Sequence, residues 1–137
     1  MKNLTSHRVI YGDTDQMGVV YYANYLRWFE MGRTELLREI GHPYTSVEEK
    51  GLRFPVIEVS CRYHRPARYD DTVLIETAIT EVGRATLNFS YGVYRQEDQT
   101  LLAAGWTKHA CVDREGHVTK IQAKLDTTLK AVISRNE

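Results

Sequence analysis

Hydrophobic residues recur along this chain with two different spacings, one of which predicts a helix and the other strands. Over residues 22–40 they return every three or four positions, which gathers them on one face of a helix of about five turns. The residues on that face are Tyr25, Phe29, Gly32, Leu36 and Ile40. Asn24 is the expected N-cap of this helix, and Gly41 followed closely by Pro43 ends it.

Most of the remaining chain favours strands, because apolar and polar residues alternate there. Strands are predicted over 5–11, 57–63, 72–82, 87–93 and 102–113. A short helix near the end is indicated by Leu125, Leu129, Val132 and Ile133. We expect that helix to fray at 135–137. The predicted order is therefore a strand, a long helix, an antiparallel meander of four strands and a terminal helix.

These elements predict one α+β domain over 1–137, in which a sheet of about five strands covers the long helix. Trp28, Phe29 and Met31 give the helix more apolar surface than one narrow stripe, so we expect the sheet to curl around it. The outer face and the edges of that sheet then stay partly open. A homodimer or a homotetramer is the expected way to close them.

Composition excludes several classes of function. The chain has 137 residues, with 18 basic and 18 acidic side chains, so it lacks the basic excess that attracts nucleic acid. No apolar run reaches the length of a membrane span, and residues 1–7 lack the apolar core of a signal peptide. Two cysteines, Cys61 and Cys111, do not make a disulfide scaffold. We therefore expect a soluble cytoplasmic protein without a nucleic-acid partner.

A polar loop just before the long helix carries the candidate chemistry. Asp13, Thr14 and Asp15 lie between Gly12 and Gly18, which allow sharp bends. The loop leads to a helix N-terminus, where unpaired N–H groups favour negative charge. A carboxylate beside such donors is what acyl hydrolysis requires, since the carboxylate activates water or attacks and the donors stabilise the oxyanion. Aspartate before a helix is also a common turn former or cap, so this pattern alone leaves both readings open.

The sequence around this loop favours the catalytic reading over the structural one. The residues from Tyr11 to Tyr25, YGDTDQMGVVYYANY, resemble the signature of the 4-hydroxybenzoyl-CoA thioesterase family, a branch of the hotdog-fold acyl-CoA thioesterases. The resemblance continues in the Arg-Thr-Glu of 33–35 and in the Arg-Pro-Ala-Arg-Tyr-Asp-Asp of 65–71. The subgroup encoded beside the bacterial Tol–Pal system is the most similar. The resemblance implies a hotdog fold, with a curled antiparallel sheet around one long central helix, and acyl-CoA thioesterase activity.

The resemblance also implies roles for individual positions. Asp15 matches the catalytic carboxylate of the family, either as nucleophile or as general base toward water. The backbone N–H of Tyr22 matches the oxyanion donor, Val20 and Tyr21 line the approach, and Tyr11 matches a supporting tyrosine. Many members of the Tol–Pal-associated subgroup have histidine where this chain has Tyr22. A phenol with a pKa near ~10 is no base at neutral pH, so only the backbone role carries over.

The remaining expectations concern the substrate. Arg84 and Thr86, at the predicted hairpin turn beside Gly83, align with a segment that contacts the phosphates of coenzyme A in the family. No His-Glu-x-x-His or comparable metal spacing occurs, and the family implies no cofactor beyond the coenzyme A of the substrate. Acyl-CoA is the expected partner, with acyl carrier protein as a second. A non-catalytic acyl-CoA or acyl-carrier-protein binding module is the alternative function, and the preferred acyl group stays open.

Overall fold

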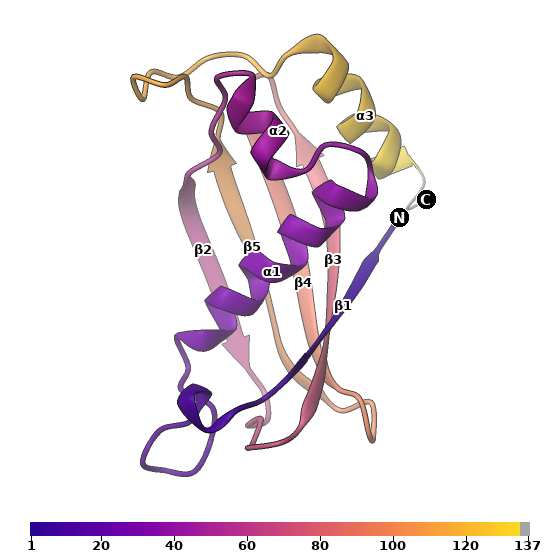
Figure 1. Cartoon of the computed structure of the whole chain (residues 1–137). Coiled ribbons are helices and arrows are strands. Elements are labelled where there is room, and N and C mark those ends of the chain that lie inside the picture. Colours follow the sequence, from indigo (N-terminus) through magenta and orange to yellow (C-terminus); the bar gives the residue numbers. More distant parts are fainter. Residues whose placement is uncertain (135–137) are drawn as a thin grey trace.

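Five antiparallel strands form one curved sheet in the computed structural model, which describes residues 1–134 (Figure 1). The strands are β1 (Asn3–Arg8), β2 (Val56–Tyr63), β3 (Thr72–Val82), β4 (Thr86–Arg95) and β5 (Leu101–Ala110). Their order across the sheet is β1-β3-β4-β5-β2. The predicted α+β class, the number of strands and the turn at Gly83 are confirmed. The predicted fraying at 135–137 lies outside the described residues.

The predicted meander of four strands is wrong for its first member. β3, β4 and β5 are consecutive neighbours, but β2 pairs with β5 at the far edge instead of with β3. The reason is that β3 already has neighbours on both sides, β1 and β4. Strand β2 instead joins the free edge of β5, and the outer edges of β2 and β1 become the two edges of the sheet.

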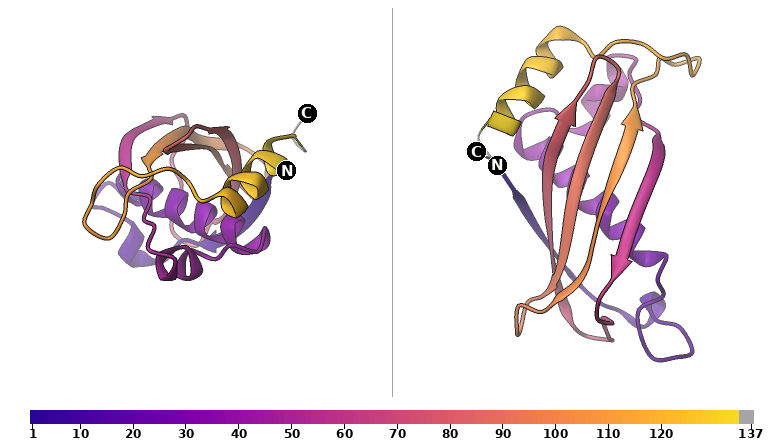
Figure 2. Two further views of the ribbon diagram at one scale, coloured as in Figure 1. Left: turned by 90° about the horizontal axis from the view of Figure 1, so that it is seen from above. Right: turned by 180° about the vertical axis from the view of Figure 1, so that it is seen from behind.

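The long helix α1 (Asn24–Glu39) crosses the concave face of the sheet, and the sheet curves over it when seen from above (Figure 2). The predicted apolar face is buried except for Ile40, which is only half-buried. The predicted N-cap is wrong, because Ala23 occupies that position. Asn24 lies inside the first turn, and its side-chain amide donates a hydrogen bond to the carbonyl oxygen of Asp13 at 2.8 Å.

Two glycines allow the helix to lie close to the sheet. A Cβ atom at Gly32 of α1 would collide with Oγ1 of Thr77 on β3. A Cβ atom at Gly105 of β5 would collide with the Ser60 carbonyl oxygen and lie 3.0 Å from the ring of Phe29. The absence of side chains at these positions lets large residues such as Phe29 fill the space between helix and sheet, where it is fully buried.

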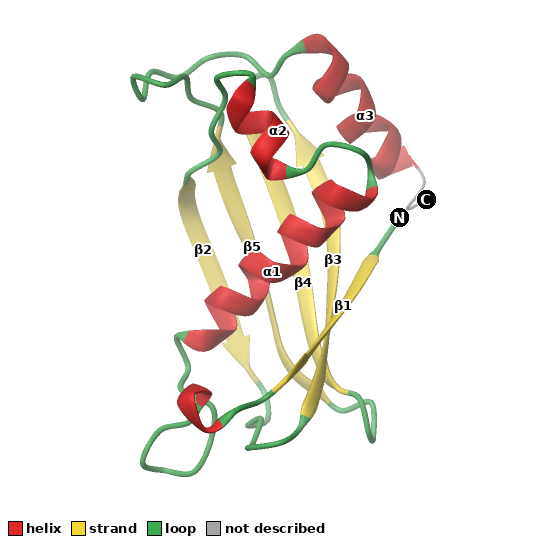
Figure 3. Ribbon diagram, in the orientation of Figure 1, coloured by secondary structure: helices red, strands yellow, loops and turns green. Residues whose placement is uncertain are grey.

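Two further helices, α2 (Tyr44–Glu49) and α3 (Ala123–Ser134), lie at the same end of the sheet (Figure 3). The predicted terminal helix is confirmed as α3, which contacts β3 and buries Leu125, Leu129 and Val132. Helix α2 was not predicted, because six residues are too few to display a helical period. No helix within residues 1–134 is long and apolar enough to cross a membrane.

Candidate active site

The loop before α1 is held in place by Asp13, which is buried. Its carboxylate accepts hydrogen bonds from Nε2 of His7 at 2.9 Å and from the N–H of Ile10 at 3.0 Å. Its backbone carbonyl accepts from the N–H of Tyr21 and from the side chain of Asn24, each at 2.8 Å. Asp13 therefore connects β1, the loop and the start of α1, and one oxygen of its buried carboxylate, Oδ2, accepts both of the hydrogen bonds from His7 and Ile10.

Asp15 is placed differently. Its backbone closes a tight turn, with its N–H donating to the Val19 carbonyl at 2.9 Å and its carbonyl accepting from Gly18 at 3.0 Å. Gly18 has a φ of 78°, which an L side chain rarely adopts. One carboxylate oxygen, Oδ1, accepts the N–H of Met17 at 2.8 Å. Within residues 1–134 the other oxygen, Oδ2, has no hydrogen-bond donor, so half of this half-buried carboxylate is available.

A cavity of about 270 Å³ opens beside Asp15 at the start of α1. Loop 15–22, the first turn of α1 and the segment after β2 contribute its lining residues: Asp15, Met17, Val19, Val20, Tyr22, Tyr25, Tyr63, His64, Arg65 and Pro66. The structure thus brings together three of the residues singled out in the sequence, Asp15, Val20 and Tyr22. Most of the lining is apolar or aromatic, with the carboxylate of Asp15 and the guanidinium of Arg65 as its ionisable polar groups alongside His64.

The segment that leads into α1 adjoins this cavity through Tyr22, which is one of the lining residues. The N–H of Val20 donates to the Ala67 carbonyl at 2.9 Å, and the N–H of Tyr21 donates to Asp13. By contrast, no acceptor for the N–H groups of Tyr22 and Ala23 is found in the described part of the chain. These two donors lie at the positive end of the helix dipole, where a negatively charged oxygen is stabilised.

The end of β2 supports this first helical turn. The hydroxyl of Tyr63 donates a hydrogen bond to the Tyr22 carbonyl at 2.9 Å, and the hydroxyl of Tyr25 accepts one from the Ala67 N–H at 3.2 Å. Burial raises the pKa of Tyr63 far above the usual value for tyrosine, so its hydroxyl keeps its proton. The sequence prediction missed Tyr63, although its place directly before the second family-like segment was a usable signal.

Two other predicted site residues stand beside the cavity without lining it. The ring of Tyr11 stacks on Tyr69 with centroids 4.0 Å apart, and its side chain is 74% exposed. Tyr21 packs against Tyr22 with ring centroids 4.7 Å apart. Tyr11 and Tyr21 therefore flank the loop within this chain, and their predicted roles toward a substrate stay predictions.

Arg84 and Thr86 lie far from Asp15 in the same chain. Strand β3 begins beside the loop, since Thr72 pairs with Arg8, and it ends at Val82 just before the turn. Ten steps of roughly 3.3 Å separate those two ends of β3. The turn lies at the α3 end of the sheet (Figure 2), where the Arg84 carbonyl accepts the N–H of Ile121 at 2.9 Å. Within one chain, these residues and Asp15 do not share a site.

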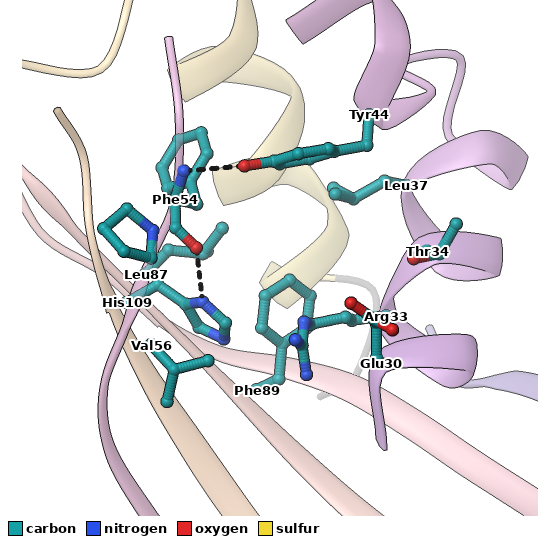
Figure 4. A pocket seen from close by; sticks show the side chains of 11 residues that line it. Glu30, Arg33, Thr34, Leu37, Tyr44, Phe54, Val56, Leu87, Phe89 and His109 are labelled. Atoms are coloured by element: carbon teal, nitrogen blue, oxygen red, sulfur yellow. Dashed lines mark hydrogen bonds between the residues drawn. The ribbon is translucent and has the colours of Figure 1, made fainter. Parts of the chain in front are cut away.

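A second cavity, of about 250 Å³, lies between α1, α2 and the sheet (Figure 4). Its walls combine apolar side chains with polar ones, and α1 contributes two charged side chains, Glu30 and Arg33. The lining residues are Glu30, Arg33, Thr34, Leu37, Tyr44, Phe54, Pro55, Val56, Leu87, Phe89 and His109. The hydroxyl of Tyr44 accepts the N–H of Phe54, which holds α2 against the segment before β2.

A chain of hydrogen bonds runs along the wall of this cavity. Nδ1 of His109 donates to the Phe54 carbonyl at 2.9 Å (Figure 4), and Nε2 lies 2.8 Å from Oγ1 of Thr107. Burial lowers the pKa of His109 to about 4, so the ring is neutral and Nε2 accepts the Thr107 hydrogen. Thr107 in turn accepts from the Tyr91 hydroxyl at 2.6 Å, and Tyr91 accepts from Arg33 at 3.5 Å. Every group between Arg33 and the Phe54 carbonyl therefore accepts from the side of Arg33 and donates toward that carbonyl.

No group of three or more His, Cys, Asp or Glu side chains within residues 1–134 is arranged to hold a metal ion. His109 and Cys111, which alternate near the end of β5, are both buried, and His109 is engaged as described above.

Comparison with known proteins places the chain in a family. Residues 17–102 match the Thioesterase superfamily. Acyl-CoA thioesterase YbgC of Haemophilus influenzae is 41% identical over 107 residues, 77% of each chain, and 4-hydroxybenzoyl-CoA thioesterase of a Pseudomonas species is 31% identical over 64% of each. The structure of protein TT1821 from Thermus thermophilus has a TM-score of 0.90 at 34% identity, covering 96% of this chain and 98% of its own. The chain belongs to the Thioesterase superfamily, which confirms the expected resemblance, the hotdog fold and thioester hydrolysis.

Proposed function

We propose that this thioesterase hydrolyses acyl-CoA or aroyl-CoA to a free acid and coenzyme A, with the Asp15 carboxylate as nucleophile or general base. One observation carries the proposal: an available carboxylate oxygen and an available N–H, that of Tyr22, belong to residues that line the same cavity. The relatives support the class of substrate, since one is named for acyl-CoA and the other for 4-hydroxybenzoyl-CoA.

In the general-base route, Asp15 takes a proton from water as the water oxygen attacks the thioester carbonyl carbon. The carbonyl oxygen becomes an oxyanion, which the Tyr22 N–H stabilises. Collapse of that intermediate breaks the carbon–sulfur bond, and the departing thiolate of coenzyme A receives the proton from Asp15. In the nucleophilic route, the carboxylate attacks the same carbon, coenzyme A leaves and water then hydrolyses the resulting anhydride. Neither route uses a metal or a further cofactor.

The proposal places the working enzyme in a homodimer, with a homotetramer as the next assembly. Strand β2 forms an edge of the sheet and exposes apolar side chains along it, which is typical of an edge covered by another chain. These side chains are Val56, Ile57, Val59 and Tyr63. Because Arg84 and Thr86 lie at the far end of their own chain, they contact the phosphates of a substrate bound by a neighbouring copy. Acyl carrier protein as a partner and a cytoplasmic location stay predictions.

The test is the Asp15→Asn variant, assayed with a thiol-reactive dye on a panel of acyl-CoA and aroyl-CoA thioesters. We expect turnover to fall by about 10²- to 10⁴-fold, because the amide neither accepts a proton nor attacks. The free energy of unfolding should change by less than about 0.5 kcal/mol, since within residues 1–134 the Asp15 side chain accepts one hydrogen bond, an exposed one from the Met17 N–H.

Asp70→Asn is the matched control, because Asp70 is an exposed aspartate of a nearby loop that does not line the cavity. It should keep full turnover. Near-normal activity of Asp15→Asn would reject the assignment of the carboxylate. A wild-type protein that binds the thioesters tightly but releases no thiol from any of them would instead indicate the non-catalytic binding module.

A further inference from the structure

The last residue of β2 makes an unusual contact with the first turn of α1. The Tyr63 hydroxyl donates to the Tyr22 carbonyl at 2.9 Å, whereas the helical donor to that carbonyl, the Tyr25 N–H, lies at a longer 3.3 Å. At this point of the chain a side chain from the sheet, rather than the helix itself, supplies the shorter hydrogen bond. The position of the turn therefore depends on β2.

The Tyr22 carbonyl belongs to the same peptide group as the Ala23 N–H. Because that group is planar, a hydrogen bond that fixes the oxygen also fixes the direction of the N–H. A donor at the oxygen also polarises the amide, which strengthens its N–H as a donor in turn. The Ala23 N–H, like that of Tyr22, finds no acceptor in the part of the chain that the structure describes.

We infer that Tyr63 is a positioning residue of the hydrolytic site, whose hydroxyl orients and polarises the peptide between Tyr22 and Ala23 so that the helix start presents its N–H groups to the oxyanion. This inference rests on the function proposed above and adds to it a residue on another element. It also makes the Ala23 N–H a second donor beside that of Tyr22.

The surroundings of Tyr63 suit this task. Its backbone is held by the pairing of β2 with β5, where it lies opposite Ala103, and its ring meets Tyr25 edge-on with centroids 5.0 Å apart. Burial raises the pKa of Tyr63, and also the pKa values of Tyr25 and Cys61 beside it. These groups stay uncharged at neutral pH, so the hydroxyl acts as a fixed dipole and not as an acid or base.

The experiment is the Tyr63→Phe variant, which keeps the ring and removes the hydroxyl. We expect kcat to fall about ten-fold, less than for a donor that touches the oxyanion itself, with KM within about two-fold of wild type. The shape of the pH profile from about pH 6 to about pH 9 should be unchanged, because the hydroxyl does not titrate there. The amide proton of Ala23 should move upfield in the NMR spectrum as its peptide loses polarisation.

Tyr94→Phe is the control, because Tyr94 lies on β4 outside the cavity and its variant also loses one tyrosine hydroxyl. It should leave kcat and the Ala23 resonance unchanged. Both variants are checked for wild-type oligomeric state by size-exclusion chromatography, since Tyr63 lies at the sheet edge.

The outcomes separate this inference from the proposed function. An unchanged kcat in Tyr63→Phe, or an effect on KM alone, overturns the positioning role, even if Asp15→Asn has lost its activity. A fall in kcat accompanied by a new ionisation in the pH profile also overturns it, because the hydroxyl would then transfer a proton. If Asp15→Asn keeps near-normal turnover, the proposed function fails first, whatever Tyr63→Phe does.

Discussion

The two ends of α1 treat polar atoms in opposite ways. At its start, an oxygen of Asp15 and the N–H groups of Tyr22 and Ala23 have no partner within residues 1–134. Beneath its second half, the buried side chain of Thr107 is hydrogen-bonded to Nε2 of His109 at 2.8 Å, and Nδ1 of His109 is hydrogen-bonded to the Phe54 carbonyl at 2.9 Å. Hydrogen-bonding capacity is left available beside the cavity at Asp15, and it is used up along the chain of hydrogen bonds from Arg33 to the Phe54 carbonyl.

The contrast also separates activity from stability. A buried polar group that loses its partner is penalised by about 1–3 kcal/mol, because it cannot turn to water instead. A half-exposed group such as the Asp15 carboxylate carries no such penalty. Substitutions at the helix start should therefore change turnover and not unfolding, and substitutions along the hydrogen-bonded wall should do the reverse. The predictions below test the second half of that statement.

The largest effect is expected for Thr107→Val. Valine fills the same space but leaves Nε2 of His109 without a donor and the Tyr91 hydroxyl without its acceptor. With two buried polar groups left without a hydrogen-bond partner, the free energy of unfolding should fall by about 4 kcal/mol, measured by denaturant titration. Thr80→Val, which loses only an exposed hydroxyl, serves as the control. A loss below about 1 kcal/mol would show that the wall does not hold the fold.

The next effect concerns pH. Burial lowers the pKa of His109 from 6.5 to about 4, so the unfolded chain takes up a proton between these values and the folded chain does not. Stability should therefore be full above pH 6.5 and fall by about 3 kcal/mol as the pH drops to about 4. His109→Gln keeps both hydrogen-bonding functions without titrating.

The measurement is the difference between the unfolding free energies of wild type and His109→Gln across this pH range. Other groups, such as His42, whose pKa is also lowered by burial, contribute equally to both proteins and cancel. Parallel curves for the two proteins would mean that His109 takes up its proton equally in the folded and unfolded states. His109 would then no longer support the view that the hydrogen-bonded groups beneath α1 hold the fold.

The smallest effect is expected for Gly32→Ala. Its new methyl group would collide with Oγ1 of Thr77 and crowd Ile75, at a penalty of about 1–3 kcal/mol. Alanine has a better helix propensity than glycine, which raises the free energy of unfolding by up to about 1 kcal/mol. The free energy of unfolding should therefore fall by about 1 kcal/mol in total. Thr77 is a useful second site, because its buried hydroxyl has no partner within residues 1–134. Adding Thr77→Ala should recover part of the loss, as a double-mutant cycle of thermal unfolding would show.

The sequence predicted the long helix, the five strands and the terminal helix, but it missed α2 and did not give the order of the strands in the sheet. The helical period of Tyr25, Phe29 and Leu36 and the alternation along β3 and β4 are local properties, so both predictions hold. Both β1 and β5 still have a free edge once the other strands have paired, and no local pattern in the sequence chooses β5 as the neighbour of β2.

The site divides in the same way. Asp15, Val20 and Tyr22 are close in sequence, and the structure places them around one cavity. Tyr63 reaches the same place only through the pairing of its strand, at a separation of 41 residues from Tyr22. Arg84 carries a charge that suits phosphates but lies at the other end of the sheet from Asp15, so its role toward a substrate stays a prediction. Contacts between distant segments set these positions, and residue spacing does not.

Because the hydrogens between Arg33 and the Phe54 carbonyl all run one way, the side chains that carry them are tied to one another as the sequence diverges. An aliphatic residue at 109 leaves the hydroxyl of Thr107 without its acceptor. An aliphatic residue at 107 leaves both Tyr91 and His109 without a hydrogen-bond partner. Related enzymes should therefore inherit positions 91, 107 and 109 as a set, replaced jointly or not at all, while the residues around Asp15 vary one by one with the substrate.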